Sequence, residues 1–314
     1  MKHFRYAKGF NAILSRRMEA IDRLTVSSIG NFLDNESLHQ ILQRVADLPA
    51  LQELKVWCSQ PVAWRHDWNF QNLRYLAIKG FGCERGTLNL PSFPTLLDLR
   101  ISFGEANELP DPMEFRAFVD LSRLPCLTSL EIKGVIDAKI DDRLTFRGVT
   151  KSLRRFTAKY MNGWTFWDAW KCMNGSLEEI RLQTSRESGR PSTELNFPRL
   201  KTLELENSLD CLPLRNIGLP VLTQIDLKLG PGDFYDLQHH LSSSISVLQK
   251  LPISLNLMHD EICFDNYWPT LLDSQDLETL AQLISLSNVR LGEDGNTILD
   301  MLSSWIVNSE LPDL

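Results

Sequence analysis

The C-terminal part of the chain has little basic charge. Residues 231–314 hold 13 acidic and two basic residues, a net charge of −11, whereas residues 1–230 hold 31 basic and 27 acidic residues, a net charge of +4. Nucleic-acid binding along a whole molecule needs a continuous basic track. The acidic end therefore argues against a nucleic-acid partner along the whole chain, although a local basic contact is compatible with the sequence.

Long apolar runs and closely spaced cysteines are also missing. No stretch approaches the ~18 uninterrupted apolar residues of a transmembrane helix. The six cysteines are far apart in the sequence and show no C-x-x-C or other short ligand spacing, which argues against a zinc site. Disulfide frameworks belong to short secreted chains that carry a signal peptide. We therefore expect buried free thiols, no metal, no cofactor, no membrane contact and an intracellular location, cytoplasmic or nuclear.

The N-terminus is rich in basic residues and has no acid. Residues 1–17 include five Lys or Arg, a composition that mitochondrial presequences share. An apolar stripe at helical spacing instead favours a packed helix with a basic outer face. Mitochondrial targeting remains the minor alternative. The stripe consists of Phe10, Ile13, Leu14, Met18 and Ile21.

A short apolar pattern, L-x-x-L-x-L with some apolar substitutions, recurs along the chain. Copies begin at residues 51, 73, 96, 127, 153, 177, 200 and 222, an earlier one begins at 21, a weaker one at 248, and a last strand is expected near 288. Within each copy apolar and polar residues alternate, as they do in a half-buried strand. One strand and one return path in every copy predict a solenoid. Its parallel strands would line a concave face, and its returns would form the convex face.

The returns between the copies differ in character. Residues 35–48 and 113–124 show helical periodicity, whereas residues 79–95 have room only for a turn or an irregular segment. A proline one or two residues before the first leucine of a copy ends the return and leads into an extended strand. The helical positions are Leu38, Ile41, Leu42, Val45 and Leu48, then Phe115, Phe118, Val119 and Leu121, and the prolines are Pro49, Pro94, Pro125, Pro198 and Pro220.

The leucine spacing over residues 20–290 resembles the leucine-rich-repeat family. That resemblance implies an α/β solenoid with a curved parallel sheet on the concave face and helices and irregular returns on the convex face. None of the eight copies that begin between residues 51 and 222 has the family's usual Asn or Cys three residues after its last apolar position. This departure and the irregular repeat lengths look more like the repeat region of F-box/leucine-rich-repeat proteins than like extracellular receptors.

No F-box is recognisable before the repeats. The first copy already begins at Ile21, which leaves too little chain for the helices of that domain. A fragment, a truncated sequence and a family member without that domain all remain open. The predicted organisation is a solenoid over residues 1–290 that includes the N-terminal basic helix, followed by a helical cap over residues 291–314. Solenoids need such caps because a terminal repeat would otherwise expose its core. The inward residues of the cap would be Ile298, Leu299, Leu302, Trp305 and Ile306.

Catalytic motifs are weak or missing. The segment 79–86, KGFGCERG, resembles a phosphate loop, but the residues after it do not start the helix that such a site needs. The six histidines form no recognised catalytic or metal-binding motif. We therefore predict that the chain is not an enzyme.

The strand residues that alternate with the leucines should face the concave side. They form mixed-charge rows that are more basic around Arg155 and Lys159 and acidic at Glu204 and Glu206. Arg, Trp and Tyr often anchor protein interfaces, so we predict a partner-binding surface here. The predicted residues are Trp57, Tyr75, Lys79, Arg100, Lys133, Arg155, Lys159, Arg181, Glu204 and Glu206.

Three tryptophans in residues 162–176 first suggest an aromatic ligand box. Trp164, Trp167 and Trp170, with Phe166 and Met173, spread over a broad arc of a helix at ~100° per residue. So broad an arc fits a helix packed against the sheet better than a binding stripe, because large aromatic side chains mostly serve burial.

The sequence leaves three functions open. The first is a protein-interaction module, for which the resemblance implies substrate recognition in an F-box-type ubiquitin ligase and possible contact with ligase subunits. The second is a leucine-rich-repeat regulator or inhibitor unrelated to ubiquitin. An enzyme or a nucleic-acid binder on an unusual solenoid is the third and least favoured.

Overall fold

The chain folds as a parallel-strand solenoid that divides into two compact units, residues 1–177 and residues 178–314. The computed structural model describes residues 3–4, 20–28, 35–58, 68, 70–81, 87–103, 116–134, 144–159, 170–183, 195–206, 217–229, 253–257, 281 and 289–291.

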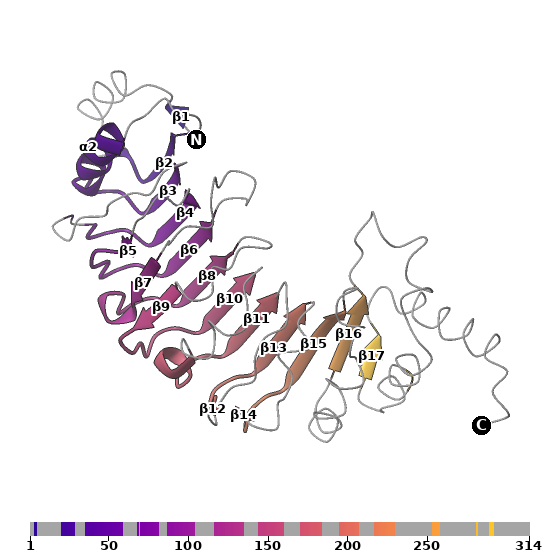
Figure 1. Cartoon of the computed structure of the whole chain (residues 1–314). Coiled ribbons are helices and arrows are strands. Elements are labelled where there is room, and N and C mark those ends of the chain that lie inside the picture. Colours follow the sequence, from indigo (N-terminus) through magenta and orange to yellow (C-terminus); the bar gives the residue numbers. More distant parts are fainter. Residues whose placement is uncertain are drawn as a thin grey trace, which may run out of the picture. The chain divides into compact units, whose positions relative to one another are not determined.

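The main strands of the first unit form parallel neighbours in the order β1-β2-β3-β4-β6-β8-β10, as Figure 1 shows. All their pairings are parallel, and they keep one register except for a shift between Lys79 and Phe81 where β4 pairs with β6. The bounds are His3–Phe4, Arg23–Ser28, Glu53–Cys58, Tyr75–Phe81, Asp98–Phe103, Ser129–Lys133 and Arg155–Lys159.

The main strands of the second unit follow the order β11-β13-β15-β16-β17 and are also parallel. Their bounds are Glu179–Gln183, Thr202–Glu206, Gln224–Leu229, Ile253–Leu257 and Val289–Leu291. The strand expected near residue 288 is therefore confirmed as β17.

The repeat pattern predicted where the strands begin. In nine copies, from residue 21 to residue 222, the strand starts two residues after the first apolar position. The weak copy at Leu248 is wrong in register, because β16 starts five residues after it, at Ile253. The apolar alternation of β16 itself, Ile253-Ser-Leu-Asn-Leu257, is the stronger signal.

The core of each unit consists of the apolar rows that the strands bury on one face. In β8 and β10, half-buried or exposed residues alternate with buried ones. Paired apolar positions stack from strand to strand, as Leu54, Leu76 and Leu99 do, each with none of its surface exposed. Removal of this surface from water is the main stabilising term.

A tight turn precedes most strands, and the prolines lie in it. The N–H of Leu127 donates to the carbonyl of Leu124 at 3.1 Å, and Pro125 lies second in that turn, where its fixed φ suits a β-turn. The same bond joins Leu51 to Leu48 at 3.4 Å around Pro49. The turn recurs over residues 93–96, 197–200 and 219–222. The recurring sequence is therefore apolar-Pro-x-Leu, which extends the repeat on its N-terminal side.

The position after each turn ties neighbouring repeats together. The carbonyl of Thr128 accepts from the N–H groups of Arg154 and Arg155 at 2.9 and 3.0 Å, and the carbonyl of Lys201 serves Thr223 and Gln224 in the same way. One carbonyl thus satisfies two donors at the start of β3, β4, β6, β8, β10, β13 and β15, as buried backbone groups require.

The helical return over residues 35–48 is confirmed. Helix α2 spans Asn35–Ala46, and its predicted inward residues are all buried, at 0–6% exposure. Leu42 and Val45 have no exposed surface. The helical period was decisive because it places the apolar residues from Leu38 to Val45 on one face, which is buried.

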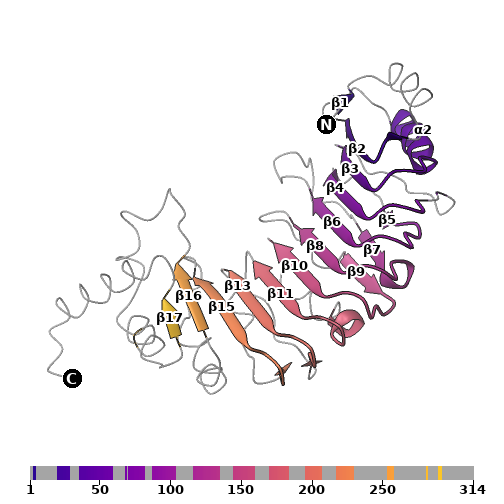
Figure 2. The same cartoon turned by 180° about the vertical axis from the view of Figure 1, so that it is seen from behind.

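The helix predicted over residues 113–124 is wrong. Residues Arg116–Asp120 form strand β7, and Leu121–Arg123 form a single 3₁₀ turn, η3. Strand β7 lies between β5 (Thr87–Asn89) and β9 (Leu144–Arg147) in a second parallel sheet, visible beside the main strands in Figures 1 and 2. The return within residues 79–95 was expected to hold only a turn or an irregular segment. It contains strand β5 and is therefore more regular than expected. Pairing with neighbouring returns overrode the local helical period, which no single repeat reveals.

The second unit contains a corresponding short pair. Strands β12 (Leu195–Asn196) and β14 (Ile217–Gly218) are parallel. Among the described residues, helical segments are few: α2, the turn η3 and isolated stretches such as residues 170–173. The expected helical convex side is thus replaced over several repeats by short parallel strands.

The aromatic segment 162–176 is buried where the structure describes its large side chains. Trp170 is 4% exposed and Met173 1% exposed, and the Trp170 ring meets Phe156 edge to face at 6.1 Å between centroids. The prediction of packing is confirmed for these two residues. Trp164, Phe166 and Trp167 lie outside the described residues.

Several other predictions fall where the structure gives no description. They are the apolar stripe of residues 10–18, the cap over 291–314 apart from Leu291, and residues 113–115. The two cysteines described as free are Cys126 and Cys172. The prediction of buried thiols is wrong for Cys126, which is exposed because it lies in the turn before β8, and Cys172 is only half-buried. In the described part of the chain no helix is long and apolar enough to cross a membrane.

Candidate functional site

The surface of interest is the polar face of the main strands, formed by the side chains that alternate with the buried rows. The parallel register aligns these side chains into three rows across the strands. In the first unit the rows are Arg23, Glu53, Tyr75, Asp98, Ser129 and Arg155; Thr25, Lys55, Ala77, Arg100, Glu131 and Thr157; and Ser27, Trp57, Lys79, Ser102, Lys133 and Lys159. Of these, Thr25 is buried, at 5% exposure.

Each acidic residue of this face in the first unit is held by a base. Glu53 lies 2.7 Å from the Nζ of Lys55 and 3.5 Å from the Nε of Arg23. Arg100 bridges two carboxylates, at 3.2 Å from Asp98 and 3.6 Å from Glu131. The face carries seven basic and three acidic residues, a net charge of +4. The acids are therefore all paired, and basic charge is left over.

Tyr75 lies between two cations of the neighbouring strands. The Nζ of Lys55 is 5.5 Å and the Cζ of Arg100 is 5.3 Å from the centre of its ring, both within the range of cation–π attraction. Burial raises the pKa of the Tyr75 phenol, and the charges of Arg100 and Lys55 oppose that rise. A hydrogen bond to Asp98 raises the pKa of Arg100. Tyr75, Lys55 and Arg100 therefore form a group at the centre of the face whose charges are already paired within the face.

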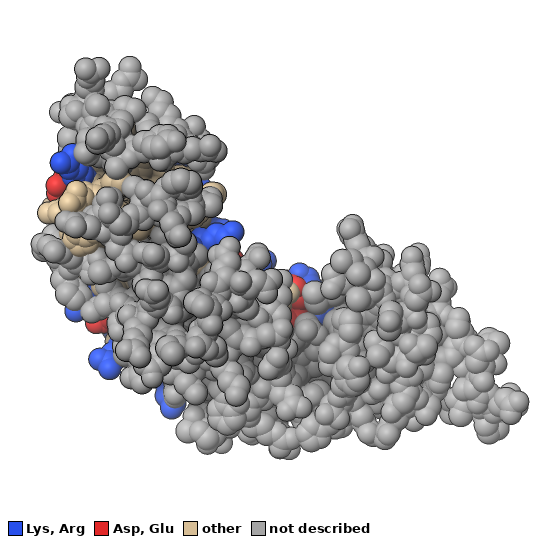
Figure 3. Space-filling model, turned by 45° about the horizontal axis from the view of Figure 1, so that its top comes forward, with Lys and Arg blue, Asp and Glu red and all other residues tan. Residues whose placement is uncertain are grey.

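The surplus basic charge lies at the carboxyl ends of the strands and on β10. The part of the third row that follows Ser27 consists of Trp57, Lys79, Ser102, Lys133 and Lys159 on β3, β4, β6, β8 and β10, and we call it the lysine row. Lys79, Lys133 and Arg155 are exposed, and Trp57 and Lys159 are half-exposed. Figure 3 shows described Lys and Arg side chains as separate blue patches with acidic ones beside some of them.

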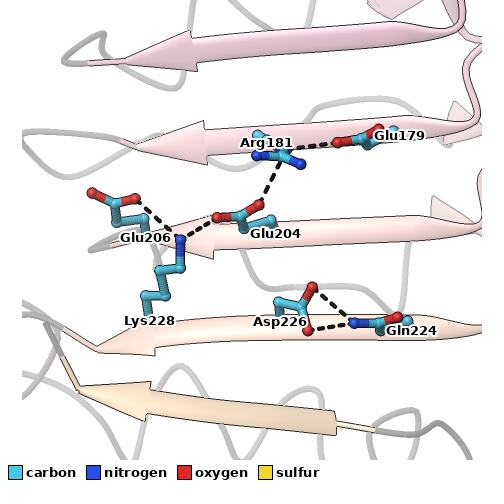
Figure 4. A network of polar contacts seen from close by, with 7 residues as sticks. All are labelled: Glu179, Arg181, Glu204, Glu206, Gln224, Asp226 and Lys228. Atoms are coloured by element: carbon cyan, nitrogen blue, oxygen red, sulfur yellow. Dashed lines mark hydrogen bonds and ion pairs between the residues drawn. The ribbon is translucent and has the colours of Figure 1, made fainter. Parts of the chain in front are cut away.

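The polar face of the second unit has the opposite balance. Over β11, β13 and β15 it holds the bases Arg181 and Lys228 against four carboxylates, a net charge of −2. Figure 4 shows how these groups meet. The acids are Glu179, Glu204, Glu206 and Asp226.

Glu204 is the centre of this second network. Its side chain is 13% exposed and binds Arg181 at 3.2 Å and, through its other oxygen, Lys228. Arg181 also donates to Glu179 at 2.6 Å, the hydrogen bond that contributes most to raising its pKa, and Lys228 lies 3.8 Å from Glu206. Asp226 accepts from the amide of Gln224 at 2.8 and 3.0 Å. Gln183, in the row of Glu206, is buried at 8% exposure.

All ten predicted site residues lie on the polar faces, in two groups. The first unit holds Trp57, Tyr75, Lys79, Arg100, Lys133, Arg155 and Lys159, among which Tyr75 contacts Arg100, and Lys133 is register partner to Lys159. The second unit holds Arg181, Glu204 and Glu206, with Arg181 and Glu204 in direct contact. The predicted residues therefore form two surfaces, one on each unit.

The predicted site residues leave out other charged residues of these networks, among them Lys55, Asp98, Glu131 and Lys228. These four occupy alternate strand positions, so the mixed-charge rows expected from the strand period already include them. What the period could not supply is the strand-to-strand register, which decides that Arg100 meets Glu131 and that Lys228 meets Glu204.

No cluster of three or more His, Cys, Asp or Glu that could hold a metal ion occurs within the described ranges. Comparisons of the chain with protein-family models, with curated proteins and with solved structures found no match. Any assignment of function must therefore come from the geometry above.

Proposed function

We propose that this chain is a protein-binding module of the leucine-rich-repeat type, whose partner lies on the polar face of the main strands and is not chemically altered there. The observation that supports it is the strict alternation of the repeats: one face forms the core, and the other presents aligned rows of charged and aromatic side chains at the spacing of the strands. Regular rows of this kind are what repeat proteins use to bind other proteins.

The character of the rows favours a protein over other ligands. Trp57, Tyr75 and Arg100 belong to the residue types that most often anchor protein interfaces. The first two rows of the first unit hold both acidic and basic groups, a mixture that sets register and selectivity between proteins. Continuous basic tracks, which a nucleic acid would need, are not formed by the described residues.

The finer assignment rests on the repeat pattern. The recurring leucine spacing and the apolar-Pro-x-Leu turn before the strands support leucine-rich repeats. Within that family, substrate recognition for an F-box-type ubiquitin ligase is proposed on the resemblance alone, because a fold does not fix a function.

Site-specific photocrosslinking tests the proposal. A photoreactive residue in place of Thr157, in the middle row of the polar face, should form protein adducts in cells of the source organism. The matched control is Val149, which is 68% exposed but lies outside the main strands. Adducts at position 157 and not at position 149 are expected, and equal or no labelling at both positions would contradict the proposal.

The identity of the adducts separates the two kinds of module. Capture of the adaptor subunit of a ubiquitin ligase together with a second protein would support substrate recognition. Capture of one protein without any adaptor would support a regulator or inhibitor.

A further inference from the structure

We propose that the polar face of β2–β10 binds an acidic, extended segment of a partner polypeptide, with the carboxylates of that segment on the lysine row and on Arg155. This inference rests on the proposed function and names the chemistry of the partner.

Charge balance is the first argument. The three acidic residues of the face are already occupied by Arg23, Lys55 and Arg100. Within the described part of the chain, Lys79, Arg155 and Lys159 have no ion pair. The charges of Lys79, Arg155 and Lys159 therefore stay available to a ligand, and an acidic segment matches them best.

The geometry of the lysine row fixes the form of the segment. Lys79, Ser102, Lys133 and Lys159 occupy paired positions on four successive strands. Since neighbouring strands lie ~4.8 Å apart, the row from Lys79 to Lys159 spans about 14 Å. Alternate side chains of an extended chain recur every ~6.6 Å, so acidic residues at every second position of a peptide of about five residues match this span.

Two further residues, Trp57 and Arg155, extend the binding surface beyond the lysines. Trp57 is the register neighbour of Lys79 and ends the row at β3 with an aromatic side chain, so an apolar residue should flank the acidic residues on that side. Arg155 lies at the other end of β10 from Lys159, about 13 Å away along the strand at ~3.3 Å per residue. It can therefore bind a carboxylate outside the row.

A nucleic acid fits the same surface less well. Glu131 lies in the row beside the lysine row and Asp98 in the row beyond it, and both pair with Arg100. A phosphate backbone that crossed the face would meet these carboxylates, whereas a peptide can place neutral side chains over them. The whole chain, with a net charge of −7, would also repel a long polyanion.

The test is a binding titration with a labelled peptide of alternating Glu and Ser, about ten residues long, against the full chain. We expect binding that weakens as salt rises towards ~0.15 M, because the Debye length shortens to ~8 Å. The double variant Arg155→Glu/Lys159→Glu should bind at least about tenfold more weakly, since attraction becomes repulsion at two positions.

A matched double variant controls for total charge. Lys151→Glu/Arg199→Glu changes the charge equally at two exposed residues outside the strands, and should alter binding by less than about twofold. Both variants should show the unfolding midpoint of the wild type. Equal weakening by the two variants, or no binding of the acidic peptide to the wild type, would overturn the inference.

Two other ligands have defined outcomes in the same assay. If a short oligouridylate bound more tightly than the peptide, and if this binding was lost in Arg155→Glu/Lys159→Glu, the face would be a nucleic-acid-binding surface. If the chain self-associated and the same variant abolished it, the acidic residues of a second copy would be the ligand. Either result overturns the assignment to a partner polypeptide.

The crosslinking assay keeps the two proposals apart. If adducts at position 157 persist unchanged in the background of Arg155→Glu/Lys159→Glu, the chain binds a protein on this face but not through acidic residues. If position 157 gives no adduct in any background, the proposed function itself fails.

Discussion

The guanidinium of Arg100 lies over the ring of Tyr75, 5.3 Å from its centre, while the same group holds the carboxylates of Asp98 and Glu131. Tyr75, Arg100 and Glu131 come from three successive strands, β4, β6 and β8. A single side chain therefore links three repeats on the polar face. Because Arg100 is paired with these two carboxylates, the basic charge of this face that has no acidic partner lies on Lys79, Arg155 and Lys159 instead.

Tyr75 should make stability depend on pH at the alkaline end. Its pKa is raised chiefly by burial, so the folded state retains the phenol proton above pH ~10, where the unfolded chain releases it. Stability of the wild type should fall with rising pH through this range relative to Tyr75→Phe, whereas the difference between the two should stay constant below it. Urea unfolding at matched pH values measures the difference.

Arg100 provides the control for that experiment. Because the charge of Arg100 lowers the pKa of Tyr75, the substitution Arg100→Gln should raise that pKa further. Isotope-labelled tyrosine followed by NMR would report the titration directly. A lower pKa of Tyr75 in Arg100→Gln would show that the ring and the guanidinium do not interact as described.

Substitution of Glu204 by Gln should destabilise the second unit by about 1 kcal/mol. The carboxylate binds both Arg181 and Lys228 and is only 13% exposed, so its loss leaves two cations without their shared partner. The exposed pair of Lys201 with Glu178, at 2.9 Å, is the comparison, and Lys201→Gln should cost less than about 0.5 kcal/mol. Urea denaturation measures both, and equal costs would contradict a central role for Glu204.

Neighbouring residues of β10 should respond in opposite ways to truncation. Phe156 is 1% exposed and packs against Phe146 and Trp170, so Phe156→Ala should cost about 3–5 kcal/mol. Thr157 lies on the polar face, and Thr157→Ala should change stability by no more than about 0.5 kcal/mol. Chemical unfolding of both variants tests the alternation that underlies the whole assignment of faces.

Gly148 should not tolerate a side chain. Its φ is +71°, and a Cβ there would lie 2.9 Å from both Asp120 Oδ1 and the backbone nitrogen of Ser122. Asp120 accepts from that N–H at 3.1 Å and so holds the turn η3. Gly148→Ala should therefore cost about 1–3 kcal/mol. Thermal unfolding measures it against Gly175→Ala, where nothing lies within 4 Å and little change is expected.

The spacing of leucines predicted the strands well because burial repeats locally. Residues such as Leu54 and Leu76 belong to segments in which every second side chain is buried, and that period is written in a few consecutive letters. The same period placed all ten candidate residues on the polar faces. Helix α2 was equally predictable, because its apolar residues from Leu38 to Val45 recur at a helical period within one short segment.

The returns were less predictable because their partners are distant in sequence. Phe118 pairs with Asn89 and Thr145 in the second sheet, and neither neighbour is visible in the local pattern around residues 113–124. The short strands form because backbone groups of successive returns satisfy one another, which favours extended chain over the helix that the local period suggests.

The sequence by itself determined the repeat, the strands, the buried rows and the identity of the residues on the polar faces, because each follows from a period of two along a short segment. Only the tertiary structure decided which of those residues meet. The register between strands places Arg100 on Tyr75 and Glu131, and Lys228 on Glu204. Register is set by the turns and the long returns between strands, whose path depends on packing against neighbouring repeats. The pairing that leaves the lysine row with surplus charge therefore could not be read from any single repeat.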